Sequence, residues 1–185
     1  MFMNSIQQKF DFSDYQIAQL KYLWITTLSE LSKFILLGII FRNDFKIYLY
    51  SICLLCILRF STGGFHCDTY LGCFFTTLTF LIISLKVLPL IVLPTYIILL
   101  FLIFCAIINL VIGPISSDKR LPQTQKTKKR LAYQSFFIIL FHLFLNTIIM
   151  SPTIIVGSWI IILHTLQLIL AKFQKIKREV AYEKS

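Results

Sequence analysis

The decisive stretch of this sequence is residues 131–171, LAYQSFFIILFHLFLNTIIMSPTIIVGSWIIILHTLQLILA, which contains no charged side chain. A helix needs about 20 apolar residues to cross the hydrocarbon core of a bilayer. Ser151-Pro152 lies at the centre of the stretch, and a proline there favours a turn or the start of a helix. The stretch therefore predicts two membrane-spanning helices, 131–150 and 153–171, joined by a tight turn.

Other apolar stretches predict further spans. Leu90 to Ile112 predicts one helix that begins after Pro89, and Thr69 to Leu85 predicts another that ends at Lys86. Two shorter helices are expected before them, at 24–41 and 45–59, with Arg42-Asn43-Asp44 between them. Glu30 and Lys33 interrupt the first of these, but they share one helical face, where opposite charges neutralise each other. The total is about six transmembrane helices.

The first 23 residues have a different pattern. Apolar Ile6, Phe10, Ile17 and Leu20 alternate with polar residues, and Trp24 follows. This pattern is typical of an amphipathic helix that lies in the membrane interface, and its polarity argues against a cleaved signal peptide. We therefore expect one all-α domain, a polytopic membrane helical bundle over residues 1–185. It comprises an interfacial helix at 1–23, a transmembrane bundle at 24–171 and a basic tail at 172–185.

Composition and charge agree with a multi-pass protein of the cell membrane. Only 14% of the residues are charged, whereas a soluble domain carries about 25%. The net charge is +10, but the positive-inside rule accounts for its distribution without nucleic acid as a partner. With six spans, most basic residues share one side, which is predicted to be cytoplasmic and in contact with anionic lipid. They are Lys9, Lys21, Arg59, Lys119, Arg120, Lys126, Lys128, Lys129, Arg130, Lys172, Lys175, Lys177, Arg178 and Lys184.

The cysteines predict no disulfide framework, because there are five of them and most lie in apolar runs. Cys53-x-x-Cys56 resembles half of a metal or redox motif, but no second pair of ligands occurs at a suitable spacing. We expect these two small residues to pack against a neighbouring helix. The sequence predicts neither a metal nor a cofactor.

The chemistry is concentrated in RFSTGGFHCDTYLGC, residues 59–73. A cysteine nucleophile needs a base that takes its proton and a positive environment for the thiolate. His66 can supply the base, and Cys73 lies near the start of the helix predicted from Thr69, where the helix dipole is positive. The alternative is that Cys73 only packs in an apolar helix and that His66 is an ordinary polar residue of a loop.

The spacing of these two residues constrains the geometry. On one unbroken helix, positions seven apart are about 10.5 Å apart along the axis, which exceeds hydrogen-bond reach. The chain between His66 and Cys73 must therefore bend, and Gly63-Gly64 allows it to do so. Asp68, Thr62 and Ser61 are all near enough in sequence to orient His66, and the sequence does not choose among them.

The same motif resembles the signature of the accessory gene regulator B (AgrB-like) family. These are membrane cysteine endopeptidases that mature the peptide pheromones of Gram-positive quorum sensing. The similarity continues through Gly113-Pro114-Ile115, Lys119-Arg120-Leu121-Pro122 and the basic run 126–130. Cys67 and Ser116-Ser117-Asp118 depart from the family pattern. Cys67 places a competing thiol beside His66.

The resemblance implies roles for individual residues. His66 would be the general base and Cys73 the nucleophile, with Arg59, Gly63 and Gly64 as supporting residues. The substrate would be an AgrD-like propeptide, cleaved through an acyl-enzyme thioester and cyclised to a thiolactone or lactone. The basic run would bind the propeptide's acidic C-terminal tail, unless membrane topology and anionic lipid alone explain it. The residues of that run are Lys126, Lys128, Lys129 and Arg130.

Two other functions compete with this prediction. His142 and His164 lie in the middle of the last two predicted spans, and ionisable residues inside a membrane are functional candidates. They could serve a small transporter or exporter, or they could be structural residues satisfied by Asn109, Asn146 or Gln167. A non-enzymatic membrane subunit that binds a partner is the second alternative. The sequence leaves self-association into a homodimer open.

Overall fold

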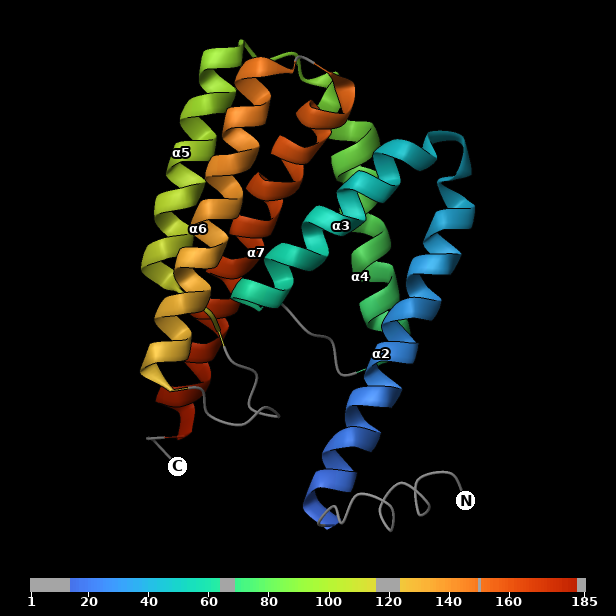
Figure 1. Cartoon of the computed structure of the whole chain (residues 1–185), viewed down its shortest axis with the longest axis vertical. Coiled ribbons are helices and arrows are strands. Elements are labelled where there is room, and N and C mark those ends of the chain that lie inside the picture. Colours follow the sequence, from blue (N-terminus) through green and yellow to red (C-terminus); the bar gives the residue numbers. More distant parts are fainter. Residues whose placement is uncertain (1–13, 64–68, 116–123, 150, 183–185) are drawn as a thin grey trace. The chain divides into compact units, whose positions relative to one another are not determined.

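A computed structural model describes residues 14–63, 69–115, 124–149 and 151–182 of the chain (Figure 1). Every regular element in these ranges is a helix, so the predicted all-α fold is confirmed. By contacts, the chain forms two compact units, Met1–Arg42 and Asn43–Ser185. The elements in chain order are α2 (Asp14–Ile40), η1 (Arg42–Asp44), α3 (Phe45–Thr62), α4 (Tyr70–Ile82), η2 (Ile83–Val87), η3 (Leu88–Leu90), α5 (Thr95–Ile112), α6 (Gln125–Ile148) and α7 (Pro152–Tyr182).

Five helical segments of the described chain are long and apolar enough to cross a membrane, which supports a multi-pass membrane protein. They are Arg42–Thr62, Tyr70–Leu90, Thr95–Ile112, Gln125–Ile148 and Pro152–Arg178. The sixth predicted span, 24–41, coincides with the second part of α2 and stays a prediction. In α2 the Lys33 ammonium donates to the Glu30 carboxylate, as their spacing predicted. The helix continues without a break from Asp14 to Ile40, so the expected boundary after residue 23 is not a helix end.

The boundary between α4 and α5 differs from the prediction. The helix that begins at Tyr70 continues through a π turn and a 3₁₀ turn to Leu90, and α5 begins only at Thr95. Pro89 is tolerated because it occupies an early position of its short helix, where no intrahelical N–H is needed. Pro94 caps α5 instead, in an extended conformation. The predicted start after Pro89 is therefore wrong, because α5 begins after Pro94.

The predicted hairpin of the last two spans is confirmed, and both of its helices are longer than expected. α6 ends at Ile148 and α7 begins at Pro152, where the Ile154 N–H donates to the Ser151 carbonyl at 3.0 Å. At its other end α6 begins at Gln125, because the Thr124 hydroxyl accepts from the Thr127 N–H at 3.3 Å. The basic run 126–130, which precedes the predicted span, is thus part of the same helix. Residues 172–182 of the predicted tail likewise continue α7.

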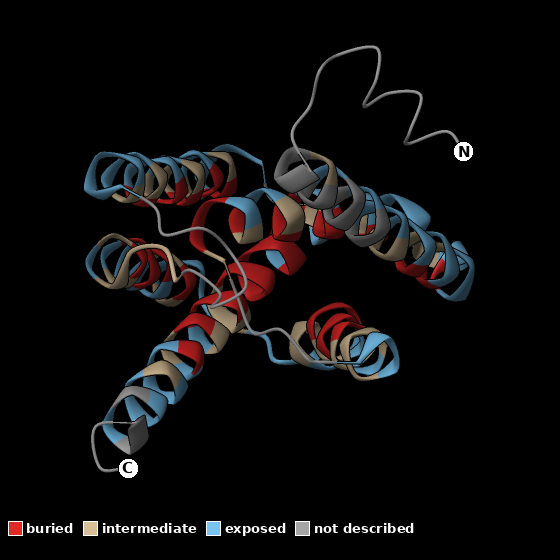
Figure 2. Cartoon of the chain, turned by 90° about the horizontal axis from the view of Figure 1, so that it is seen from below, coloured by how far each residue is buried: buried red, intermediate tan, exposed pale blue. Residues whose placement is uncertain are grey.

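α7 is the central helix of the Asn43–Ser185 unit. It contacts α3, α5, α6 and the η2–η3 segment, and 61% of its membrane span is buried, against 28% for each of α4, α5 and α6. Figure 2 shows this buried face of α7 among its neighbours. A helix that is covered on several sides can carry polar side chains, because neighbouring helices supply their hydrogen-bond partners.

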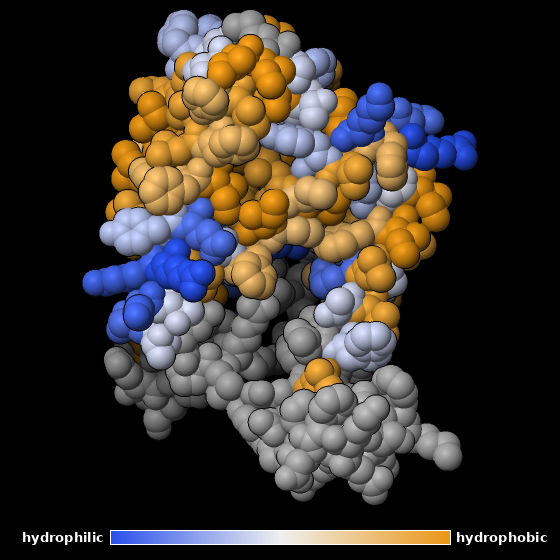
Figure 3. Space-filling model, viewed as in Figure 1, coloured by the Kyte–Doolittle hydropathy of each residue, from blue (hydrophilic) through white to orange (hydrophobic). Residues whose placement is uncertain are grey.

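The bundle of this unit is apolar outside and partly polar inside. Leu100, Phe104 and Val111 expose a row of large apolar side chains on α5, and Phe137 and Phe141 do the same on α6. In Figure 3 the hydrophobic surface forms a broad area, and hydrophilic side chains gather below it where α6 begins and α7 ends. Several buried residues are polar, as expected where lipid is the solvent and interhelical hydrogen bonds hold the helices. They include Asn109, Ser135, His142, Asn146, Ser158 and His164.

Candidate active site

Cys73 lies in the first turns of α4, as the sequence predicted. Thr69 caps this helix, and its hydroxyl accepts from the Gly72 N–H at 3.1 Å. The Cys73 N–H donates to the Thr69 carbonyl at 3.0 Å, and the Thr77 hydroxyl donates to the Cys73 carbonyl at 2.9 Å. The side chain is half-buried. A thiolate in this place is close to the positive end of the helix dipole and remains accessible to a substrate.

His66 falls outside the described residues, together with Gly64, Cys67 and Asp68. The hydrogen bond between His66 and Cys73 therefore stays a prediction, and so does the choice of a residue that orients His66. The structure does define both ends of the segment that carries the histidine. Gly63 ends α3 on one side, and Thr69 caps α4 on the other.

Gly63 occupies a position that only glycine fits. Its φ of 75° and ψ of −153° fall in a region that is essentially restricted to glycine. A Cβ atom on this residue would also lie 2.5 Å from the Ile115 carbonyl oxygen. The Gly63 N–H donates to the Arg59 carbonyl at 2.9 Å, which closes the last turn of α3. The backbone of α3 thus turns away from its helix in direct contact with the chain that follows α5.

Thr62, one of the three residues that the sequence offered for orienting His66, connects three helices at the same point. Its carbonyl accepts from the Ile115 N–H at 2.9 Å, and its hydroxyl lies 2.8 Å from Nε2 of His164 on α7. The Thr62 side chain is completely buried. The ends of α3 and α5 are therefore fastened to each other and to α7 immediately before residues 64–68.

Arg59 lies one turn before Gly63 and is half-buried. A cation in the last turn of a helix is favoured by the helix dipole. Its Nε is buried and has no hydrogen-bond partner within the part of the chain that the structure describes. The guanidinium is close enough to His164 for the two groups to interact electrostatically. The predicted supporting residue thus belongs to the same cluster as Thr62 and His164.

Asn109 extends this cluster on α5. Its amide nitrogen donates to the Thr165 hydroxyl at 2.8 Å and to the Cys105 carbonyl at 2.8 Å. The Asn109 carbonyl then points to no partner among the described residues, and the same holds for the Gln167 carbonyl. We call Arg59, Thr62, Asn109, His164 and Thr165 the His164 cluster.

His142 forms a second and separate cluster. Its Nδ1 lies 2.8 Å from the Tyr50 hydroxyl of α3, and its Nε2 lies 3.1 Å from the Ser158 hydroxyl of α7. A Cβ on Gly157 would lie 2.5 Å from Cε1 of His142 and 2.7 Å from Cε1 of Tyr50, so this glycine admits both rings. Neither Asn109, Asn146 nor Gln167 supplies the hydrogen bonds of either histidine, contrary to our expectation. Among the described residues no hydrogen bond connects the two clusters.

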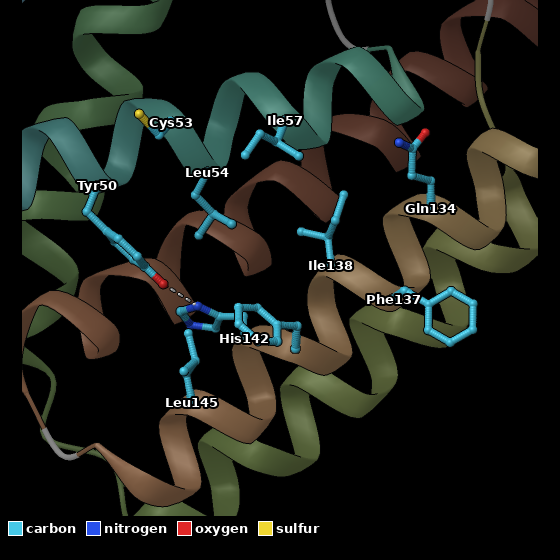
Figure 4. A pocket seen from close by; sticks show the side chains of 10 residues that line it. Tyr50, Cys53, Leu54, Ile57, Gln134, Phe137, Ile138, His142 and Leu145 are labelled. Atoms are coloured by element: carbon cyan, nitrogen blue, oxygen red, sulfur yellow. Dashed lines mark hydrogen bonds between the residues drawn. The ribbon is translucent and has the colours of Figure 1, made fainter.

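Tyr50 and His142 also line a groove of about 490 Å³ between α3 and α6. Figure 4 shows the Tyr50 hydroxyl pointing to the imidazole, with Leu54, Ile57 and Ile138 along the same groove. The exposed thiol of Cys53 borders it, so Cys53 does not pack against a helix as we expected. The lining is almost wholly apolar. No group of three His, Cys, Asp or Glu side chains within the described ranges is arranged to hold a metal ion.

The four predicted substrate-binding residues occupy the first two turns of α6. Lys126, Lys129 and Arg130 are exposed, and Lys128 is half-buried. No acidic residue lies in this first turn, and the dipole at a helix start disfavours cations by about 0.3–1 kcal/mol each. Basic residues of α7, by contrast, lie far from the first turn of that helix, so this penalty does not apply to them, and its last turn contains none. The α6 group therefore needs a compensating anion more than the α7 group does.

These features define a class of protein: a polytopic helical membrane protein with a half-buried cysteine in the first turns of α4. The family model described as Accessory gene regulator B matches residues 1–171, and the chain belongs to this family. An AgrB-like protein of Clostridium beijerinckii is 32% identical over 134 residues. The matched segment covers 69% of this chain and 66% of that relative, slightly less than two thirds of the relative's length. No solved structure matches the chain.

Proposed function

We propose that this protein is a membrane-embedded cysteine endopeptidase that cleaves a quorum-sensing propeptide at Cys73. The observation that carries the proposal is the placement of the Cys73 thiol. It is half-buried in the first turns of α4, only a short segment after the anchored end of α3. That short segment contains His66. Membership of the accessory gene regulator B family supports a role in quorum sensing.

The proposed reaction has two acyl transfers. His66 takes the thiol proton of Cys73, and the thiolate attacks the carbonyl carbon of the scissile peptide bond. The C–N bond breaks, the leaving amine receives the proton from His66, and the remaining acyl group is a thioester on Cys73. A thiol or hydroxyl of the same substrate then attacks the thioester and closes a thiolactone or lactone ring, which regenerates the Cys73 thiol.

The position of Cys73 suits the intermediate in this scheme. The residue lies four positions after the capping Thr69, about 6 Å along the helix from its start. A thioester at this depth is partly withdrawn from water, which would otherwise hydrolyse it before the ring closes. The Gly72 and Cys73 N–H groups are already bonded to Thr69. The positive end of the α4 dipole is therefore the feature that would stabilise the oxyanion formed during each attack.

The proposed substrate contact is the basic start of α6. An AgrD-like propeptide with an acidic C-terminal tail would offset the unfavourable dipole at Lys126, Lys128, Lys129 and Arg130. That tail belongs to the fragment that leaves, so its attraction positions the bond without retaining the cyclic product. Anionic lipid is the alternative partner for the same charges.

The proposed site faces the cytoplasm. The start of α6 and the end of α7 carry most of the basic residues of the described spans, and the positive-inside rule supports a cytoplasmic location for both. A cysteine introduced at Gln125 into a variant without native cysteines should resist an impermeant maleimide added to intact cells. Strong labelling from outside would reverse the proposed orientation.

The experiment that tests the enzymatic proposal is cleavage of a co-expressed propeptide. Cys73→Ala and His66→Ala should each abolish cleavage while the amount of protein in the membrane stays the same. Cys53→Ala, Cys67→Ala and Cys105→Ala are the matched controls and should retain most of the activity. Continued cleavage by Cys73→Ala, or loss of activity in Cys67→Ala, would show that the nucleophile is assigned to the wrong residue.

A further inference from the structure

His164 is attached to the end of α3 by a single directed contact. Its Nε2 lies 2.8 Å from the Thr62 hydroxyl, which is buried. Through its backbone carbonyl Thr62 also holds Ile115 at 2.9 Å. The next residue, Gly63, has no room for a side chain against the Ile115 carbonyl. A change at His164 is therefore transmitted to the point where the chain leaves α3.

The hydrogen bonds of Thr62 favour one arrangement of protons. The Thr62 hydroxyl oxygen lies 2.9 Å from the Leu58 carbonyl oxygen and 3.3 Å from the Gly63 carbonyl oxygen, and both carbonyls can only accept. With its one proton donated to a carbonyl, the Thr62 oxygen accepts from Nε2–H of His164. In the neutral ring this leaves Nδ1 as an acceptor, and it has no partner within the described residues. His164 thus uses its one ring N–H to hold Thr62.

The His164 cluster is buried but only partly hydrogen-bonded among the described residues. His164 is 0% exposed. Three buried polar atoms of the cluster, and one of Gln167 on the same helix as His164, have no hydrogen-bond partner within the described ranges. Unsatisfied buried polar groups are costly, and a packed apolar core would avoid them. The unpartnered atoms are Nε of Arg59, Oδ1 of Asn109, Nδ1 of His164 and Oε1 of Gln167.

We infer that His164 is a positioning residue for the proposed reaction. By holding Thr62, it fixes the direction in which the chain leaves α3 toward His66, and so sets where the base meets Cys73. The inference rests on the proposed function. It assigns His164 a task in the peptidase rather than in proton transport, and it makes Thr62 the residue through which that task is performed.

The test uses paired variants of the full-length protein in vesicles of zwitterionic lipid. His164→Leu and Thr62→Val remove the donor and the acceptor of the contact, while His164→Gln and Thr62→Ser keep a polar group in each place. His142→Leu is the matched control, because it also removes a buried histidine from the bundle. The measurements are kcat and KM for propeptide cleavage, and the rate at which iodoacetamide alkylates Cys73, each normalised to folded protein.

The inference predicts a specific pattern. His164→Leu and Thr62→Val should lower kcat about 100-fold, since a misplacement of about 1 Å has this effect, with KM little changed. Both should slow alkylation of Cys73, because only the thiolate reacts. His164→Gln and Thr62→Ser should recover most of each loss. His142→Leu should lower the amount of folded protein but leave kcat and the alkylation rate of the folded fraction as in the wild type.

Two results would separate the failure of this inference from failure of the proposed function. If His66→Ala slows alkylation and cleavage but His164→Leu does not, or acts only as His142→Leu does, the positioning role is wrong and the peptidase proposal stands. If His66→Ala leaves both rates at the wild-type value, the proposed dyad itself is wrong.

Discussion

His142 on α6 and His164 on α7 are both almost completely buried, with 1% and 0% of their surface exposed, yet their surroundings differ. One consistent set of protons satisfies His142. Tyr50 donates to Nδ1, Nε2–H donates to Ser158, and Ser158 donates to the Ile154 carbonyl. His164 has one bonded nitrogen and one without a partner within the described residues.

This difference separates a residue that holds the bundle together from one that serves the site. The His142 cluster ties α3, α6 and α7 through hydrogen bonds that each contribute about 0.6–1.7 kcal/mol in a membrane. None of the hydrogen-bonded residues of the His142 cluster, Tyr50, His142 and Ser158, lies within residues 59–73. The His164 cluster adjoins that segment and, among the described residues, has buried polar atoms without partners, which structural packing alone would not favour.

A glycine accompanies each cluster, and the two glycines are constrained in different ways. Gly63 faces a backbone carbonyl and has a positive φ, whereas Gly157 faces the rings of His142 and Tyr50. Backbone can shift less than a side chain that is free to rotate. Substitution at these glycines therefore tests whether the two regions have different tasks.

The largest effect is expected for Gly63→Ala. The glycine-only conformation costs about 1–3 kcal/mol for another residue, and the overpacked contact with Ile115 adds about 1–3 kcal/mol. Cleavage should fall at least as far as in His164→Leu. Gly113→Ala is the matched control, because Gly113 also has a positive φ of 66° but has open space for a Cβ. If the two variants had equal activity, the contact between Gly63 and Ile115 would have no role in the site.

A smaller and different effect is expected for Gly157→Ala. The added methyl group must displace His142 or Tyr50, at a cost of about 1–3 kcal/mol. We predict a lower thermal unfolding temperature in detergent, with kcat of the folded protein unchanged. A loss of kcat without a loss of stability would place the His142 cluster in the reaction and would remove the distinction between the two clusters.

The smallest effect is expected at the basic start of α6. Replacing Lys126, Lys128, Lys129 and Arg130 by Gln should raise KM more than it lowers kcat, and it should weaken the dependence of KM on salt. The assay uses purified protein in zwitterionic lipid, which removes the contribution of anionic headgroups. The same change at Lys172, Lys175, Lys177 and Arg178 of α7 is the control. Equal responses of the α6 and α7 variants would show that these charges contribute to membrane topology and do not bind the substrate.

The sequence predicted the elements that depend on local chemistry. Ser151-Pro152 identified the α6–α7 turn, and the apolar run after Thr69 placed Cys73 at a helix start. It placed the start of α5 after Pro89, whereas α5 begins after Pro94, because either proline can begin a helix. It began α6 only at residue 131, where the uncharged stretch starts, whereas Thr124 caps a helix that also includes the basic run.

The partners of the two histidines could not be predicted, because they depend on how helices distant in sequence pack. Thr62 is 102 positions from His164, and Tyr50 is 92 positions from His142. Thr62 and Tyr50 both carry hydroxyls in apolar helices. Such a hydroxyl indicates a candidate hydrogen-bonding residue, but it does not show which histidine is its partner. The contact between Gly63 and Ile115 is likewise a product of packing, and neither residue type predicts it.

The most direct test of the central proposal is to trap the acyl-enzyme. A propeptide whose ring-closing thiol or hydroxyl is replaced by hydrogen should leave its N-terminal fragment on the protein as a thioester. We predict an adduct of that mass on the peptide that contains Cys73, released by hydroxylamine and absent from Cys73→Ala. Cleavage of this propeptide without any adduct, or an adduct on Cys67 instead, would contradict the account.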